Sequence, residues 1–114
     1  MSEIAVSEYR VYPTGYDEAT FSDKFSFTIT VAWRNEGQWA VCWMGDCLNK
    51  RGEWEYESIP SSRTEAFFKR CRFTEDEAKR RALEAVDKLT INGRTFQQAD
   101  AWVKARIAEG ASRG

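Results

Sequence analysis

Large apolar and small side chains alternate without a break from residue 25 to residue 33, and this alternation restricts the fold more than any other feature. Phenylalanine, isoleucine, valine and tryptophan occupy the odd positions, while serine, threonine and alanine occupy the even ones. Because successive side chains of a β-strand point to opposite faces, the pattern predicts a strand with one buried face. The chain must therefore supply neighbouring strands and a cover for that face.

Two turn signals predict where the neighbouring strands lie. The segment 35–37 (NEG) predicts a hairpin turn with Gly37 at positive φ, and the segment 49–52 (NKRG) predicts a second turn. Strands are therefore expected at 38–48 and 53–59, with a looser strand at 4–12. The expected cross-strand pairs are Trp33 with Trp39, Val31 with Val41, Leu48 with Glu53, Cys47 with Trp54 and Asp46 with Glu55.

The hydrophobic period changes from two to 3.6 after Phe73. Thr74 and Glu77 form a capping box that predicts a helix ending near Leu89, and another helix is expected to begin after Thr95. Residues 64–70 predict one short helical turn. The last helix is expected to bury Phe96, Ala99, Trp102, Val103 and Ile107.

These elements predict a single α+β domain over residues 1–114, an antiparallel three- to four-stranded meander sheet with two main helices packed on one face. Residues 1–23 would form a loosely attached N-terminal strand and loop, 24–59 the sheet and 64–109 the helical part. No apolar run approaches the roughly 20 residues that a membrane helix needs. The N-terminal residues do not have the pattern of a secretory signal, so the cytoplasm is the expected location.

The sequence contains no histidine, which removes the commonest general base and the usual partner of a serine or cysteine nucleophile. It contains three cysteines, Cys42, Cys47 and Cys71. The first two are an odd number of positions apart on one predicted strand, so they are expected on opposite faces, with Cys47 in the core. We therefore expect a non-enzyme with no catalytic residues, no metal site and no cofactor.

An acidic surface is one candidate binding site. Four carboxylates are expected on the sheet face away from the helices, beside a weakly apolar strip, where like charges opposed across strands are destabilising. A basic protein surface or a divalent ion would relieve that repulsion, but the pattern by itself favours an ordinary solvated face on which Lys24, Lys50 and Arg51 dilute it. The candidate protein-binding residues are Asp46, Glu53, Glu55, Glu57, Met44 and Ile59.

A basic segment is the alternative site. Six basic residues lie between positions 69 and 81, and pairs such as Glu75 with Lys79 account for about half of them as an ordinary solvated helix face. The remainder could contact nucleic-acid phosphates. The residues proposed for this alternative are Lys69, Arg70, Arg72, Lys79 and Arg80.

The order of strands and turns from EYRVYP through the segment 25–63, CRFTEDEAKRRA and LTINGRT resembles a group of small uncharacterised proteins of actinobacteria and their phages, over roughly residues 8–95. This resemblance implies a phage or actinobacterial accessory protein, and it implies no functional residues or oligomeric state. We expect such a protein to bind a host or defence protein, in the host cytoplasm if a phage encodes it. The three strands before FTEDEAKRRAL are also similar to AP2-type and integrase-arm DNA-binding domains, which read the duplex with the outer sheet face. Here that face is expected to carry Glu53, Glu55 and Glu57, which would repel phosphates.

Overall fold

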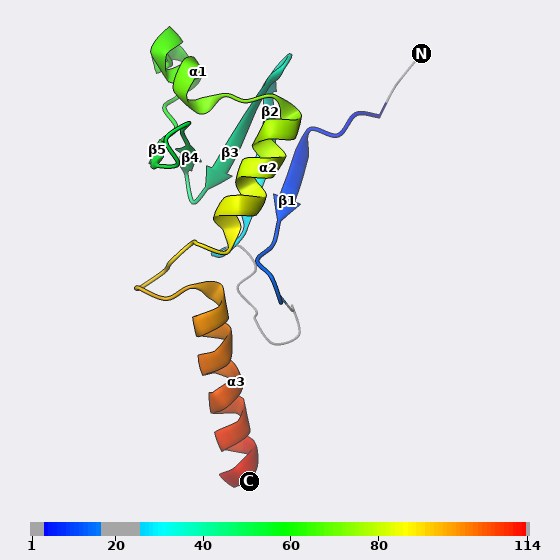
Figure 1. The fold of residues 1–114 in the computed structure, drawn as a ribbon, viewed down its shortest axis with the longest axis vertical. Coiled ribbons are helices and arrows are strands. Elements are labelled where there is room, and N and C mark those ends of the chain that lie inside the picture. The colour runs from blue at the N-terminus through cyan, green and yellow to red at the C-terminus, as the bar shows by residue number, and fades with distance from the viewer. Residues whose placement is uncertain (1–3, 17–25, 114) are drawn as a thin grey trace.

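The computed structural model describes residues 4–16 and 26–113, which form an α+β fold with one antiparallel sheet (Figure 1). The five strands of this sheet are neighbours in chain order, so the sheet is a meander. Its strands are β1 (Glu8–Val11), β2 (Ile29–Asn35), β3 (Gln38–Trp43), β4 (Asp46–Leu48) and β5 (Trp54–Tyr56). The helices that follow are a 3₁₀ turn (Pro60–Ser62), α1 (Glu65–Cys71), α2 (Glu75–Val86) and α3 (Phe96–Arg113).

The sheet has more strands than expected because the segment 38–48 folds back on itself. Trp43 pairs with Asp46, which leaves Met44 and Gly45 as a two-residue turn with φ angles of 49° and 87°. Positive φ at both central residues is the geometry of the tight hairpin turn that matches strand twist. The usual sequences for this turn are Asn-Gly and Asp-Gly, so Met-Gly gave no clear signal.

The first hairpin has the predicted register, with Trp33 opposite Trp39 and Val31 opposite Val41. The register predicted for the last hairpin is wrong by one residue. Asn49 closes that turn, since its side-chain oxygen accepts hydrogen bonds from the backbone N–H groups of Arg51 and Glu53 at 2.9 and 3.0 Å. The observed pairs are Leu48 with Trp54, Cys47 with Glu55 and Asp46 with Tyr56.

The two-residue turn at Met44 and Gly45 places the side chains of β4 on the faces opposite to those expected for an unbroken strand, and the register with β5 shifts by one residue in consequence. Cys47 therefore lies opposite Glu55 on the outer face, and not opposite Trp54 in the main core. Cys42 lies directly opposite Cys47, so these two cysteines share one face, contrary to the expectation from their spacing. Asp46 does not oppose Glu55, and the predicted repulsion between these two carboxylates does not exist.

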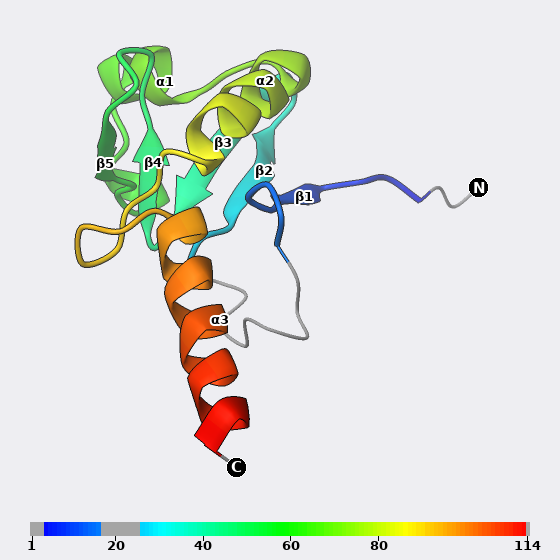
Figure 2. The same cartoon turned by 60° about the horizontal axis from the view of Figure 1, so that its bottom comes forward.

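The main core fills the space between α2 and one face of the sheet. Thr74 caps α2 as predicted, because its hydroxyl accepts a hydrogen bond from the Glu77 backbone N–H. Alanines on the buried face of α2 allow the helix to approach the β2 and β3 side chains closely (Figure 2). The buried core residues are Phe27, Ile29, Val31, Trp39, Val41, Leu48, Phe73, Ala78, Ala82, Val86, Leu89 and Phe96.

Helix α1, which the sequence had predicted only as one short helical turn, lies on the opposite face of the sheet from α2. Helix α1, capped by Thr64, packs Phe67 and Cys71 against Cys47 on the other face of the sheet, here called the outer face. Its path is fixed by Phe73, which exchanges two backbone hydrogen bonds with Trp39 at 2.8 and 3.0 Å. The outer face is therefore covered by α1 beside β4.

Helix α3 extends away from the sheet (Figure 1). Phe96 at its first residue is buried, and Ala99 and Val103 are half-buried. The predicted burial of Trp102 and Ile107 is wrong, because they are 49% and 57% exposed. The helical period was read correctly, but the sheet ends before the second half of the helix.

Candidate functional site

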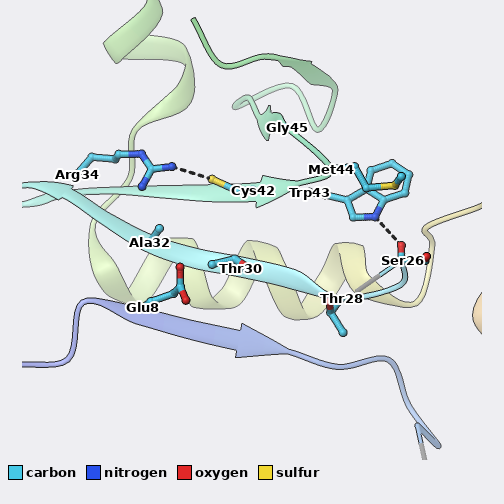
Figure 3. Close-up of a pocket in the computed structure, with 10 residues that line it drawn as sticks. All are labelled: Glu8, Ser26, Thr28, Thr30, Ala32, Arg34, Cys42, Trp43, Met44 and Gly45. Carbon is cyan, nitrogen blue, oxygen red and sulfur yellow. Dashed lines mark hydrogen bonds between the residues drawn. The ribbon is translucent and has the colours of Figure 1, made fainter. Parts of the chain in front are cut away.

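The outer face carries a groove floored by small side chains of β2 and the segment before it. Thr28, Thr30 and Ala32 line it, with Arg34 at one end (Figure 3). The cavity measures about 380 Å³. Its other walls are Glu8, Ser26, Cys42, Trp43, Met44 and Gly45.

Three arginines converge on one carboxylate at the closed end of this face. Oε1 of Glu57 lies 2.7 Å from Nε of Arg34, 3.0 Å from Nη2 of Arg63 and 3.6 Å from Nη2 of Arg72. We call these four residues the arginine cluster. Burial raises the pKa of the Glu57 carboxyl, but the Arg34 hydrogen bond and the charges of all three arginines outweigh it and lower that pKa overall.

The cluster draws its members from separate parts of the chain. Arg34 is on β2, and it reaches Glu57 across the face because Ala32 and Ala40 in the neighbouring positions end at Cβ. Arg72 follows α1 and is almost fully buried, with its guanidinium 5.1 Å from the centre of the Phe67 ring. Cys42 completes the contacts, since it accepts a hydrogen bond from Nη2 of Arg34 at 3.4 Å.

A second ion pair lies beside the cluster. Both oxygens of Glu55 accept hydrogen bonds from Arg70, at 3.2 and 2.8 Å, and Asn49 donates another at 2.9 Å. The hydrogen bond with Arg70, followed by the bond from Asn49, lowers the pKa of Glu55 to about 2. Glu55 and Glu57 are therefore both neutralised by arginines of the same chain.

The predicted acidic surface does not form as a single patch. Its two central carboxylates pair with arginines, Asp46 turns to the core side opposite Tyr56, and Glu53 is exposed in the turn. The predicted basic residues supply some of those arginines, so α1 occupies the position in which a basic partner was expected. Met44 and Ile59 are exposed as predicted, at 69% and 60%.

The remaining basic residues of the alternative site are also mostly paired. Lys79 lies 3.0 Å from Glu75, and Arg80 lies 3.2 Å from Glu84. Lys69 is the one member of the predicted set without an ion pair among the residues that the structure describes. Little cationic charge is left on this side for phosphate contacts.

The cysteines lie close together under α1. Cys47 and Cys71 are fully buried and share a hydrogen bond, and all three thiols are free. Burial raises the pKa of Cys42 and of Cys47 to about 12, and it also raises the pKa of Cys71. Within residues 4–16 and 26–113, no three cysteine, aspartate or glutamate side chains are arranged to hold a metal ion.

Three exposed apolar residues belong to the β3–β4 turn, to β5 and to the segment after it. Asp46 pairs with Tyr56, and the Glu57 backbone N–H donates to the Gly45 carbonyl oxygen at 3.5 Å, so the backbone of the turn lies beside residues 56–57. Met44 is 69%, Tyr56 71% and Ile59 60% exposed. We call Met44, Tyr56 and Ile59 the tip patch.

Two parts of this site were missed from the sequence. Arg34 continues the even-numbered series of outer-face positions after Ala32, so the period of β2 did carry a signal for it. The sequence gives no signal for the roles of Arg63 and Arg72, because their contacts with Glu57 depend on where α1 packs.

None of the helices in the described residues is both long and apolar enough to span a bilayer. Comparison with protein-family models, with curated proteins and with solved structures finds no match to this chain.

Proposed function

We propose that this chain is a non-catalytic protein-binding domain whose contact surface is the tip patch together with the adjoining outer-face groove. The observation that carries this proposal is the exposure of three large apolar side chains at one end of the sheet. Met44, Tyr56 and Ile59 are 69%, 71% and 60% exposed. Exposed aromatic and methionine side chains grouped beside a polar groove are typical of protein contact surfaces.

The backbone of Met44 gives this proposal a second support. Its φ of 49° is a left-handed conformation that costs a non-glycine residue roughly 1–2 kcal/mol. Asparagine would fit the turn better, and the exposed Met44 side chain contributes little to the core. A residue that costs stability and packs little in the free protein is expected where it contacts something else.

The revised surface differs from the acidic one expected from the sequence. Glu55 and Glu57 are neutralised internally, so they do not form the centre of the contact, whereas Met44 and Ile59 keep their proposed role. The resemblance to actinobacterial and phage proteins supports a host or defence protein as the partner and the host cytoplasm as the location.

Affinity capture from actinobacterial lysate tests the proposal. The double variant Met44→Asn, Ile59→Ser removes two apolar contacts of the tip patch and relieves the strained turn, so it should fold at least as stably while losing the captured protein. The matched control is Leu83→Ser, since Leu83 is an apolar side chain of similar exposure, 64%, on α2.

Nuclease treatment of the lysate separates the two functional classes. Recovery of one stoichiometric protein after nuclease treatment, lost in the double variant and kept in Leu83→Ser, supports the tip patch. Capture that survives the double variant, or that disappears with nuclease, contradicts it. In the second case binding through nucleic acid would replace protein binding.

A further inference from the structure

Strand β1 forms one edge of the sheet, and β2 is its only neighbouring strand among the described residues. The segment before it, residues 4–7, extends away from the sheet in both views (Figure 1 and Figure 2). Residues 4–8, 10 and 12 are exposed. An exposed edge strand is a template on which another strand can pair.

The pairing with β2 determines which backbone groups of β1 point outward. The Trp33 N–H donates to the Ser7 carbonyl oxygen at 2.8 Å, and the same register continues along β1. In an antiparallel pair, opposed residues alternate between those that exchange hydrogen bonds and those that do not. Since Ser7 bonds to β2, the backbone groups of Tyr9 also face β2, whereas those of Glu8 and Arg10 face away from it.

These outward groups allow two copies of β1 to pair around a two-fold axis. Hydrogen bonds form in such a pair only where even-numbered residues oppose each other. One register places Glu8 opposite Arg10 of the second copy, twice, with the two Tyr9 residues at the axis. A shift of one strand by two residues opposes Glu8 to Glu8 or Arg10 to Arg10. Opposite charges across strands stabilise and like charges destabilise, so the charges favour the first register.

The flanking residues match in the same register. Val6 and Tyr12 are 57% and 41% exposed, and the register that opposes Glu8 to Arg10 also opposes Val6 to Tyr12 of the second copy. Edge strands are commonly protected from pairing by exposed charges, especially lysines. Glu8 and Arg10 have opposite signs, and their order makes the edge complementary to a second copy of itself.

We propose that the chain forms a symmetric dimer in which a second copy pairs antiparallel with β1, with Glu8 opposite Arg10 of the second copy. The two-fold axis is perpendicular to the sheet, so both α2 helices lie on one face of the joined sheet. Each copy offers this edge once, so the pairing closes as a dimer. The tip patch lies towards the opposite edge of the sheet, so this inference goes beyond the proposed function and does not rest on it.

Sedimentation of the purified native chain, from micromolar to millimolar concentrations, tests the dimer. The contact is short, so association should depend strongly on concentration. The average mass should rise from that of one chain to that of two and stop there. A mass that stays at one chain would overturn the proposal. Growth beyond two chains would also overturn it, because an open series of contacts requires two different surfaces.

Charge reversal identifies the register. Glu8→Arg or Arg10→Glu alone places like charges at both opposed pairs, and each should weaken dimerisation about tenfold or more. An equimolar mixture of these two variants should dimerise as the native chain does, because every mixed pair opposes opposite charges. The double variant Glu8→Arg, Arg10→Glu should recover for the same reason, and it tests the exchange within one chain. Loss without recovery in the mixture and in the double variant would contradict the proposed pairing.

The matched controls lie in the exposed turn between β4 and β5. Glu53→Arg and Arg51→Glu change the net charge by the same amounts, and dimerisation should stay within twofold of the native chain. Equal loss in these controls would show a general charge effect and no pairing through β1. A native chain that stays monomeric but loses a lysate partner in Glu8→Arg would indicate that β1 accepts a strand of another protein. The dimer is measured on the purified chain, so its failure is distinct from that of the tip patch.

Discussion

One oxygen of Glu57 accepts hydrogen bonds from Arg34 and Arg63 and lies 3.6 Å from Arg72, and the Glu57 side chain is 9% exposed. Replacing it with glutamine keeps the size of the side chain and removes its charge, so three arginines lose their shared counter-ion. Breaking a buried ion pair by removing one partner costs about 3 kcal/mol or more. We expect Glu57→Gln to lower the free energy of unfolding by about that amount in urea denaturation.

The control for this change is Glu53→Gln, since Glu53 is exposed in the turn. Its effect should stay within about 0.5 kcal/mol. If Glu57→Gln lowers the free energy of unfolding no more than Glu53→Gln does, the arginine cluster contributes nothing to the stability of the fold.

Glu55 gives the stability of the protein a defined dependence on pH. Arg70, and then Asn49, lower the pKa of Glu55 from 4.5 to about 2. A carboxyl whose pKa is lower in the folded than in the unfolded state contributes stability above the unfolded value, and this contribution is lost as pH falls through the folded value. The free energy of unfolding should therefore decrease from about pH 4.5 towards pH 2.

Glu57, Glu75 and Asp87 also have lowered pKa values, so they too contribute to the loss of stability at low pH. The variant Glu55→Gln separates the contribution of Glu55 from theirs. Urea denaturation at a series of pH values should give a shallower fall for the variant than for the native protein. Two parallel curves would show that the Arg70–Glu55 pair does not persist in solution.

At the scale of elements, each hairpin depends on its turn. Gly37 marks the first turn clearly, and the register around Trp33 and Trp39 was predicted correctly. The other two turns depend on Met44 in a left-handed conformation and on Asn49 bonding to the backbone two and four residues later. Their residue types allow several turn geometries, so the faces of β4 could not be assigned from the sequence, whereas Trp54 of β5 lies on the core side as expected.

Helix α3 carries a separate prediction. Residues 104–110 are exposed, and the second half of a helix of this length gains little from propensity alone. Ending the chain at Lys104 should reduce the helical circular dichroism signal but change the free energy of unfolding by no more than about 0.5 kcal/mol. Phe96→Ala, at a residue that is 1% exposed, should instead cost about 3–5 kcal/mol.

A truncated chain that is destabilised as strongly as Phe96→Ala would contradict this expectation. It would mean that the second half of α3 packs against the domain, or against a second copy of the chain, in solution.

At the scale of the whole molecule, thiol reactivity reports opening of the outer face. Burial raises the pKa of Cys42 and Cys47 to about 12 and also raises that of Cys71, so few thiolates exist near neutral pH. An aromatic disulfide reagent at pH 8 should modify all three thiols rapidly in guanidinium chloride and only slowly in the native protein. Low urea concentrations should accelerate the native reaction.

A thiol that reacts in the native protein as fast as free glutathione would contradict this burial. It would also revive cysteine-based chemistry, which the lack of histidine and the position of the thiols argue against.

Local sequence patterns were sufficient to predict the α+β class of this protein. The alternation from residue 25 to 33 required a sheet with one buried face, and the capping box at Thr74 and Glu77 required a helix. These are local properties, because period and capping depend on residues a few positions apart. They predicted an α+β fold and the core side of β2 and β3.

Which charged side chains form ion pairs depends on the tertiary fold. Arg34, Arg63 and Arg72 converge on Glu57 because α1 crosses to the outer face and Phe73 pairs with Trp39. The two charged surfaces expected from the sequence are thereby largely joined into one internal network. Ion pairing depends on distances of a few ångströms between residues that are up to 23 positions apart in this cluster, from Arg34 to Glu57, and no local pattern encodes such distances.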